Sequence, residues 1–204
     1  MRAMISQLYR QTLALAQQCD GLPPLLVRCY LAPVLLQAGW QKYAYFADTV
    51  AWFGADGLNL PWPWLMALLA TTTELVGGVL ILIGLATRLA ALPLAITMLV
   101  AIVTVHAEHG WLAIADSHSW LANGTLWRDD SVLASAEKLQ RAQSILQQHG
   151  NYDWLTSSGN LVILNNGAEF AATYLLMLLM LLVTGGGRWT SLDHWLSRYS
   201  QQSS

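Results

Sequence analysis

Long apolar stretches alternate with polar segments along this chain. The apolar stretches cover residues 25–43, 65–86, 89–106 and 165–183. Each is close to the roughly 20 residues that an α-helix needs to cross the hydrocarbon layer of a bilayer. The pattern therefore predicts four transmembrane helices. Residues 44–60, between the first two stretches, are expected to form a loop.

Two polar segments carry weaker helical patterns. Residues 3–18 place apolar side chains at helical spacing among polar neighbours, which predicts a short interfacial helix. Residues 107–160 hold most of the acidic side chains and are expected to lie outside the membrane. Within this insertion, residues 131–148 have amphipathic helical spacing, with Asp130 placed to cap the start and Gly150 to end the helix.

Composition agrees with a chain that is solvated by lipid. Of its 204 residues, 55% are hydrophobic and 11% are charged, whereas a soluble domain carries roughly 25% charged residues. So few charges cannot form the polar shell of a soluble protein of this length. The predicted fold class is an all-α integral membrane four-helix bundle, with residues 1–204 as a single domain. A net charge of −2 excludes a basic face for nucleic acid.

Basic residues near the ends of the predicted spans indicate the orientation. With four spans, one side of the membrane receives Arg2, Arg10, Arg88, Arg188 and Arg198. Only Lys42 lies close to a span end on the other side. By the positive-inside rule, both termini are expected to be cytoplasmic, in a bacterial inner membrane, with the insertion on the outer side. Arg88, at a very short turn between spans, is interpreted as an orientation anchor.

Four ionisable side chains fall within or near the predicted spans: Arg28, Lys42, Glu74 and Glu169. Charged groups at membrane depth are costly, and each is therefore a candidate for a functional site. One interpretation is a polar cavity lined by these groups. The other is that they hold the helices together by pairing with one another or with backbone groups. The sequence leaves both open.

Histidines at the end of the third span are the most metal-like feature. His106 and His109 share a face if the helix continues, Glu108 lies between them, and imidazole suits zinc or copper. A closed site needs a further ligand, such as His118 or His149. The alternative is that these histidines lie at the wet end of a helix and bind nothing.

The polar markers resemble those of the DoxX family of small four-helix membrane proteins. The matching segments are Arg28, Gly39–Lys42, Glu74–Gly78, Leu82–Ala91, Asn166–Glu169, Gly185–Gly187 and Ser191–Asp193. Two departures stand out: the insertion at 107–160, and Gly185-Gly186-Gly187 where the family usually has Gly-Pro-Gly. The insertion and the histidine pair are similar to the HvfX-like subgroup, which is encoded beside copper-responsive peptide-maturation genes.

The resemblance implies an accessory subunit of a redox or stress/metal-response membrane system rather than a stand-alone enzyme. DoxX relatives include the small subunit of a thiosulfate:quinone oxidoreductase, so a quinone or a copper or zinc ion is the implied cofactor. One alternative is a non-enzymatic scaffold or assembly factor that recruits a protein partner through residues 107–160. A second is a small-solute or metal transporter, which the absence of a visible inverted repeat disfavours.

Overall fold

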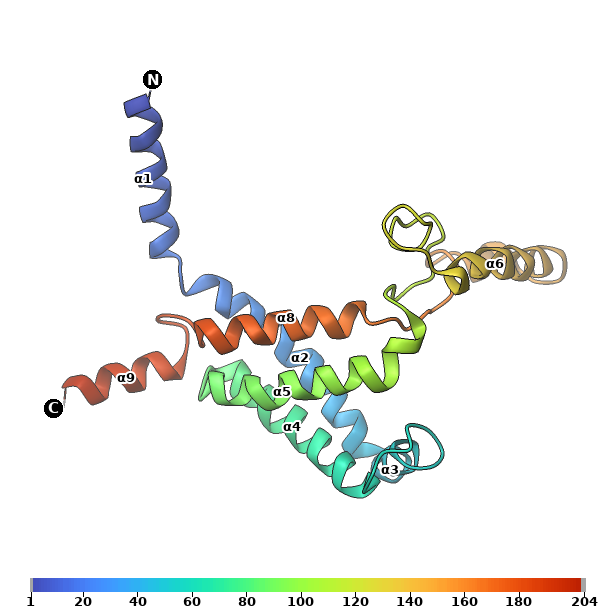
Figure 1. Ribbon diagram of the computed structural model, residues 1–204, viewed down its shortest axis with the longest axis horizontal. Helices are drawn as coiled ribbons and strands as arrows, with labels where there is room; N and C mark the ends of the chain where they lie inside the picture. The colour runs from blue at the N-terminus through green and yellow to red at the C-terminus, as the bar shows by residue number, and fades with distance from the viewer. Residues whose placement is uncertain (1, 203–204) are drawn as a thin grey trace. The chain divides into compact units, whose positions relative to one another are not determined.

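A computed structural model describes residues 2–202, and the described chain is helical with two isolated β-bridges. It divides into two compact units, residues 1–99 with 174–204 and residues 100–173. The whole insertion at 107–160 lies in the second unit, and Figure 1 labels most of the helices along the chain. The helices are α1 (Arg2–Gln18), α2 (Leu22–Ala44), α3 (Phe46–Phe53), α4 (Pro63–Ile83), α5 (Thr87–Ala101), α6 (Asp130–His149), α7 (Tyr152–Leu155), α8 (Glu169–Thr184) and α9 (Leu192–Gln202).

Three helices are long and apolar enough to cross a membrane. They cover Leu22–Ala44, Pro63–Ile83 and Thr87–His109, the last formed by α5, a π-helical turn and a 3₁₀ turn. Helix α8 is also apolar, but its 16 residues extend only about 24 Å at 1.5 Å per residue. The prediction of an all-α membrane fold is confirmed.

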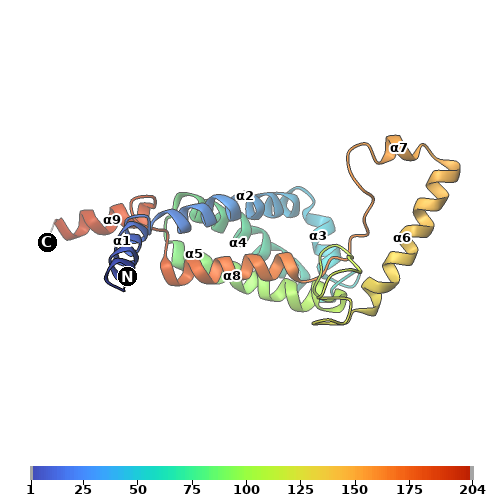
Figure 2. The same cartoon turned by 90° about the horizontal axis from the view of Figure 1, so that it is seen from above.

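One hydrophobic core unites α2, α4, α5 and α8, which pack together in both views (Figure 2). Leu31 and Leu35 of α2 and Leu94 of α5 are fully or almost fully buried there, together with Leu178 and Leu181 of α8. The helices therefore form a four-helix core. The backbones approach most closely between α2 and α4, where Gly39 and Gly78 leave no room for a Cβ.

The outward faces of the same helices are apolar and exposed. Leu92 and Ile96 of α5 are 51% and 53% exposed, and Leu176 of α8 is 66% exposed. A soluble protein rarely exposes apolar patches this extensive, because exposing each apolar side chain to water costs free energy. Lipid removes that cost. The chain is an integral membrane protein.

The structure changes several predicted boundaries and adds helices. Helix α4 ends at Ile83 because Gly84 adopts the left-handed conformation, three residues before the predicted end of that span. Residues 44–60 are not simply a loop, since they contain α3. Helix α9 was not predicted either. Both are short helices outside the spans, so hydropathy gave little signal for them.

The second unit has its own small core, in which Leu112, Ala122 and Val132 are buried. The amphipathic helix predicted over 131–148 is confirmed as α6, and Gly150 ends it by donating its N–H to the carbonyl of Leu146. The predicted cap was wrong by one residue. Asp129 holds the extended cap conformation and accepts from the amides of Ser131 and Val132, while Asp130 already belongs to the helix.

Asp129 has an electrostatic signature of this capping role. The Ser131 hydroxyl donates to its Oδ1, and this bond lowers the pKa of the carboxyl below its usual range. Because the pKa is lower in the folded than in the unfolded chain, the contribution to stability is complete at neutral pH. It is lost as the pH falls through the folded-state value.

We predict that Asp129→Ala loosens the start of α6 at neutral pH, because two amides lose their acceptor. Losing an N-cap costs about 1 kcal/mol, which corresponds to roughly fivefold faster amide exchange. Hydrogen–deuterium exchange of the full chain measures this. Asp130→Ala is the matched control, since Asp130 pairs only with exposed Arg128. Equal effects of the two substitutions would show that Asp129 is not the cap.

Candidate functional site

Arg28 joins three segments of the first unit through its guanidinium. The side chain projects from α2 and is buried, with 1% exposed. Its Nε and Nη2 donate to the carbonyls of Ile81 and Leu82 at the end of α4, at 2.7 and 2.8 Å. Its Nη1 donates to the carbonyls of Gly186 and Thr190 after α8, at 2.7 and 3.1 Å. The guanidinium therefore binds two carbonyls of the last turn of α4 and two of the segment between α8 and α9.

Asp193, which carries a negative charge, binds the turn next to the carbonyls that Arg28 binds. Its two carboxylate oxygens accept from the amides of Ala86 and Thr87, at 2.6 and 2.9 Å, and so cap the start of α5. Its own N–H donates to the carbonyl of Gly84. A carboxylate at a helix N-terminus also interacts favourably with the helix dipole. The turn between α4 and α5 is thus held by the segment that begins α9.

Gly84 is required in this turn for two reasons. Its φ is +68°, a conformation that residues with a Cβ rarely adopt. A Cβ there would also lie 2.7 Å from Cζ of Arg28 and 2.6 Å from Cβ of Ser191. The glycine therefore lets the guanidinium reach the end of α4.

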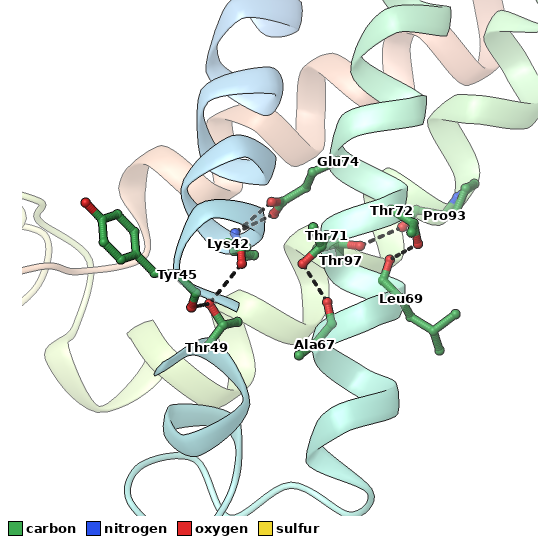
Figure 3. Close-up of polar contacts among 10 residues, drawn as sticks. All are labelled: Lys42, Tyr45, Thr49, Ala67, Leu69, Thr71, Thr72, Glu74, Pro93 and Thr97. Atoms are coloured by element: carbon green, nitrogen blue, oxygen red, sulfur yellow. Dashed lines mark hydrogen bonds and ion pairs between the residues drawn. The ribbon is translucent and has the colours of Figure 1, made fainter. Parts of the chain in front are cut away.

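Lys42 and Glu74 form an ion pair between α2 and α4, in which the ammonium faces the carboxylate (Figure 3). Nζ lies 2.9 and 2.7 Å from the two carboxylate oxygens. The Glu74 side chain is 4% exposed and the Lys42 side chain 25%. Gly39 allows the close approach, because a Cβ there would contact Glu74 and Leu75 at 3.0 and 2.9 Å.

The four predicted site residues do not all come together. Lys42 follows Arg28 by 14 positions on α2, about 21 Å along a helix, and the two side chains have different partners. Glu169 lies in the second unit, where its Oε2 accepts from the amide of Ala113 at 3.0 Å. The structure thus brings Lys42 to Glu74 and gives Arg28 and Glu169 backbone partners.

The histidines engage separate partners. Nδ1 of His106 lies 2.7 Å from the carbonyl oxygen of Asn166, and Nε2 of His109 lies 3.8 Å from a carboxylate oxygen of Glu108. Between them the helix changes from π to 3₁₀ geometry, which breaks the assumed α-helical spacing. Within residues 2–202 no three His, Cys, Asp or Glu side chains are grouped to hold a metal ion.

Sequence reasoning named Arg28 but missed Asp193 as its counterpart. Asp193 lies in the first turn of a helix that hydropathy did not reveal, and its partners are 106 and 107 residues away in sequence. Arg88, predicted as an orientation anchor, is exposed beside the same turn.

Comparison with known proteins finds a family that is similar to part of this chain. The family model described as DoxX matches residues 24–107. Over these residues the chain is similar to the DoxX family. The matched region contains Arg28 and the Lys42–Glu74 pair, which link α2 to α4, together with Gly84 and Arg88.

A curated relative of this chain is "Putative oxidoreductase CatD" of Bacillus subtilis (strain 168), which is 34% identical over 92 residues. The matched stretch covers 45% of this chain and 66% of the relative, just under two thirds of its length. No solved structure matches the chain significantly. Residues beyond 107 lie outside the family match, and they include most of the insertion and Asp193.

We predict that Lys42→Met destabilises the bundle more than Glu74→Gln does. Removing Lys42 leaves a buried carboxylate without its partner, at a cost of about 3 kcal/mol. Removing Glu74 leaves an ammonium that is 25% exposed and whose long side chain can extend to a more polar region. The double variant should recover part of the loss, with a coupling of about 1–3 kcal/mol.

Unfolding of the detergent-solubilised chain, followed for both single variants and the double variant, measures this coupling. The pair Glu137–Arg141 on α6 is the matched control, because both side chains are exposed and should couple several-fold more weakly. Strictly additive effects of the Lys42 and Glu74 substitutions would contradict the ion pair.

Proposed function

We propose that this protein is an accessory membrane subunit of a redox system. The proposal draws on the similarity to the DoxX family and on the name of the Bacillus subtilis relative. The observation that carries it is that Arg28 and Glu74, the two buried charged side chains of the spans, have partners within the chain. Arg28 binds four carbonyls and Glu74 binds Lys42.

Such saturation favours a structural role for the bundle. A group that performs chemistry must be able to contact substrate, through a proton or a free lone pair. In the bundle, Arg28 instead binds backbone carbonyls, and Glu74 binds Lys42 of the neighbouring helix. Fold alone does not determine activity, so the redox step in this proposal belongs to a partner protein.

The second unit supplies a surface for that partner. It exposes four tryptophans: Trp111, Trp120, Trp127 and Trp154, which are 43%, 66%, 64% and 71% exposed. Aromatic side chains are enriched at protein interfaces, where they bury a large area at low cost in conformational entropy. The same observation supports the second candidate function, a scaffold whose partner has no redox cofactor. The two differ only in what binds.

Orientation belongs to the same proposal. The positive-inside rule supports an inner-membrane location with cytoplasmic termini, which puts the second unit on the outer side of the membrane. The partner is then a periplasmic or membrane-bound protein. Cysteine-accessibility labelling at Ser157 and Ser200 would report on the two sides.

We predict that cross-linking of the full-length chain in its native membrane captures a protein with flavin, haem or iron–sulfur absorbance. Replacing Trp120, Trp127 and Trp154 with alanine should release that protein, because these exposed side chains belong to the proposed partner surface. Glu74→Gln is the matched control, since it changes the bundle and leaves the second unit intact. Absorbance spectroscopy and quinone-reductase activity of the purified assembly are the measurements.

Two outcomes would contradict the redox assignment. A specific partner without a redox cofactor supports the scaffold function instead. Quinone-reductase activities that stay unchanged in membranes lacking the chain exclude an accessory role in quinone-linked electron transfer.

A further inference from the structure

A pocket of about 880 Å³ lies at one end of the bundle, within the first unit. It is bordered by the start of α2, the turn between α4 and α5, the end of α8 and the polar face of α9. Its walls are partly cationic and partly apolar. The cationic part includes Arg88 and Arg188, and the apolar part includes Leu89 and Met180.

Two side chains in the pocket wall have polar atoms without a partner. Thr87 is 0% exposed, and its Oγ1 has no hydrogen-bond partner among residues 2–202. Nε2 of His194 is also buried and has no hydrogen-bond partner among these residues. Buried polar groups are almost always hydrogen-bonded, so two orphaned atoms beside one pocket indicate a site that a ligand completes.

The charges around the pocket favour an anion. Two aspartates line it, but Asp193 is committed to the amides of Ala86 and Thr87, and Asp20 pairs with Arg188 at 3.2 Å. Arg88 is exposed and has no ion-pair partner in the described part of the chain. One arginine is therefore uncompensated, and a second is held by an exposed pair of the kind that contributes little.

Helix α9 indicates where the anion comes from. Its residues Leu192, Trp195 and Leu196 are 44%, 53% and 58% exposed and form one apolar face, while Asp193 and His194 line the pocket. An amphipathic helix with tryptophan on its apolar face lies in the interface of a bilayer. The pocket on its other face is then at the depth of lipid phosphates.

We propose that this pocket binds the phosphate headgroup of an anionic membrane lipid. Arg88 and Arg188 contact the phosphate oxygens with charge-assisted hydrogen bonds. The Thr87 hydroxyl and the His194 ring complete the polar contacts. Leu89 and Met180 pack against the glycerol and the upper acyl chain. The ligand is an amphiphile because the pocket has both kinds of wall.

Binding of short-chain phosphatidylglycerol to the full chain in neutral detergent tests the proposal. We expect saturable binding that phosphatidylcholine of the same acyl length does not show. Arg88→Gln should weaken binding about tenfold, because it removes a charge-assisted contact. Arg141→Gln on α6 is the matched control, since it removes one positive charge outside the pocket and should leave the affinity unchanged.

A second variant blocks the pocket by volume. Ser197 lines it from α9 and is exposed, so Ser197→Trp should abolish binding without a change of charge or of the bundle core. Inorganic phosphate and glycerol phosphate form the remaining arms. If either competes at the same concentration as the lipid, the pocket is a free-phosphate site and the lipid assignment is overturned. Equal weakening by Arg88→Gln and Arg141→Gln, or no saturable binding, overturns it as well.

Discussion

The first unit depends on the hydrogen bonds that the guanidinium of Arg28 donates to backbone carbonyls. A helix that ends near the membrane leaves carbonyls that need donors, and lipid provides none. Arg28 supplies donors to Ile81 and Leu82 in the last turn of α4, and to Gly186 and Thr190 in the segment between α8 and α9. Its positive charge also suits the C-terminal ends of helices. One buried side chain thus replaces the water that these carbonyls lack.

The pocket at this end follows from that arrangement. With α4 ended at Gly84, Asp193 can cap α5, and the start of α9 is fixed against the turn. This places His194 and Ser197 in the wall of the same pocket as Arg88 and Arg188. The lipid-binding role proposed for the pocket and the structural role of Arg28 therefore depend on the same contacts. Arg28 binds the C-terminal end of α4, and Asp193 binds the N-terminal end of α5, as the helix dipoles favour.

How much the sequence could predict depended on the physical signal behind each element. Long apolar stretches located α2, α4, α5 and α8 because lipid exposure demands continuous hydrophobicity. The same signal is silent for α3 and α9, which lie outside the spans. The cap of α6 was ambiguous because Asp129 and Asp130 are neighbours of equal capping ability, and only backbone conformation distinguishes them.

The candidate site was predictable in its residues and not in its contacts. Because a charged group inside a membrane is costly, the sequence identified four candidate site residues: Arg28, Lys42, Glu74 and Glu169. The pairing of Lys42 with Glu74 was among the alternatives, whereas the partners of Arg28 are backbone carbonyls 53 to 162 residues away. Backbone acceptors carry no residue identity, so no sequence pattern marks them.

The most direct measurement of this account is hydrogen–deuterium exchange of the Arg28→Lys variant in detergent. A lysine keeps the charge but cannot reach both helix ends. We expect amides of residues 81–87 and 186–193 to exchange about tenfold faster together, while Arg88→Lys leaves both segments unchanged. If the amides of both segments exchange as slowly in the Arg28→Lys variant as in the original chain, Arg28 does not hold these two segments, and the account fails.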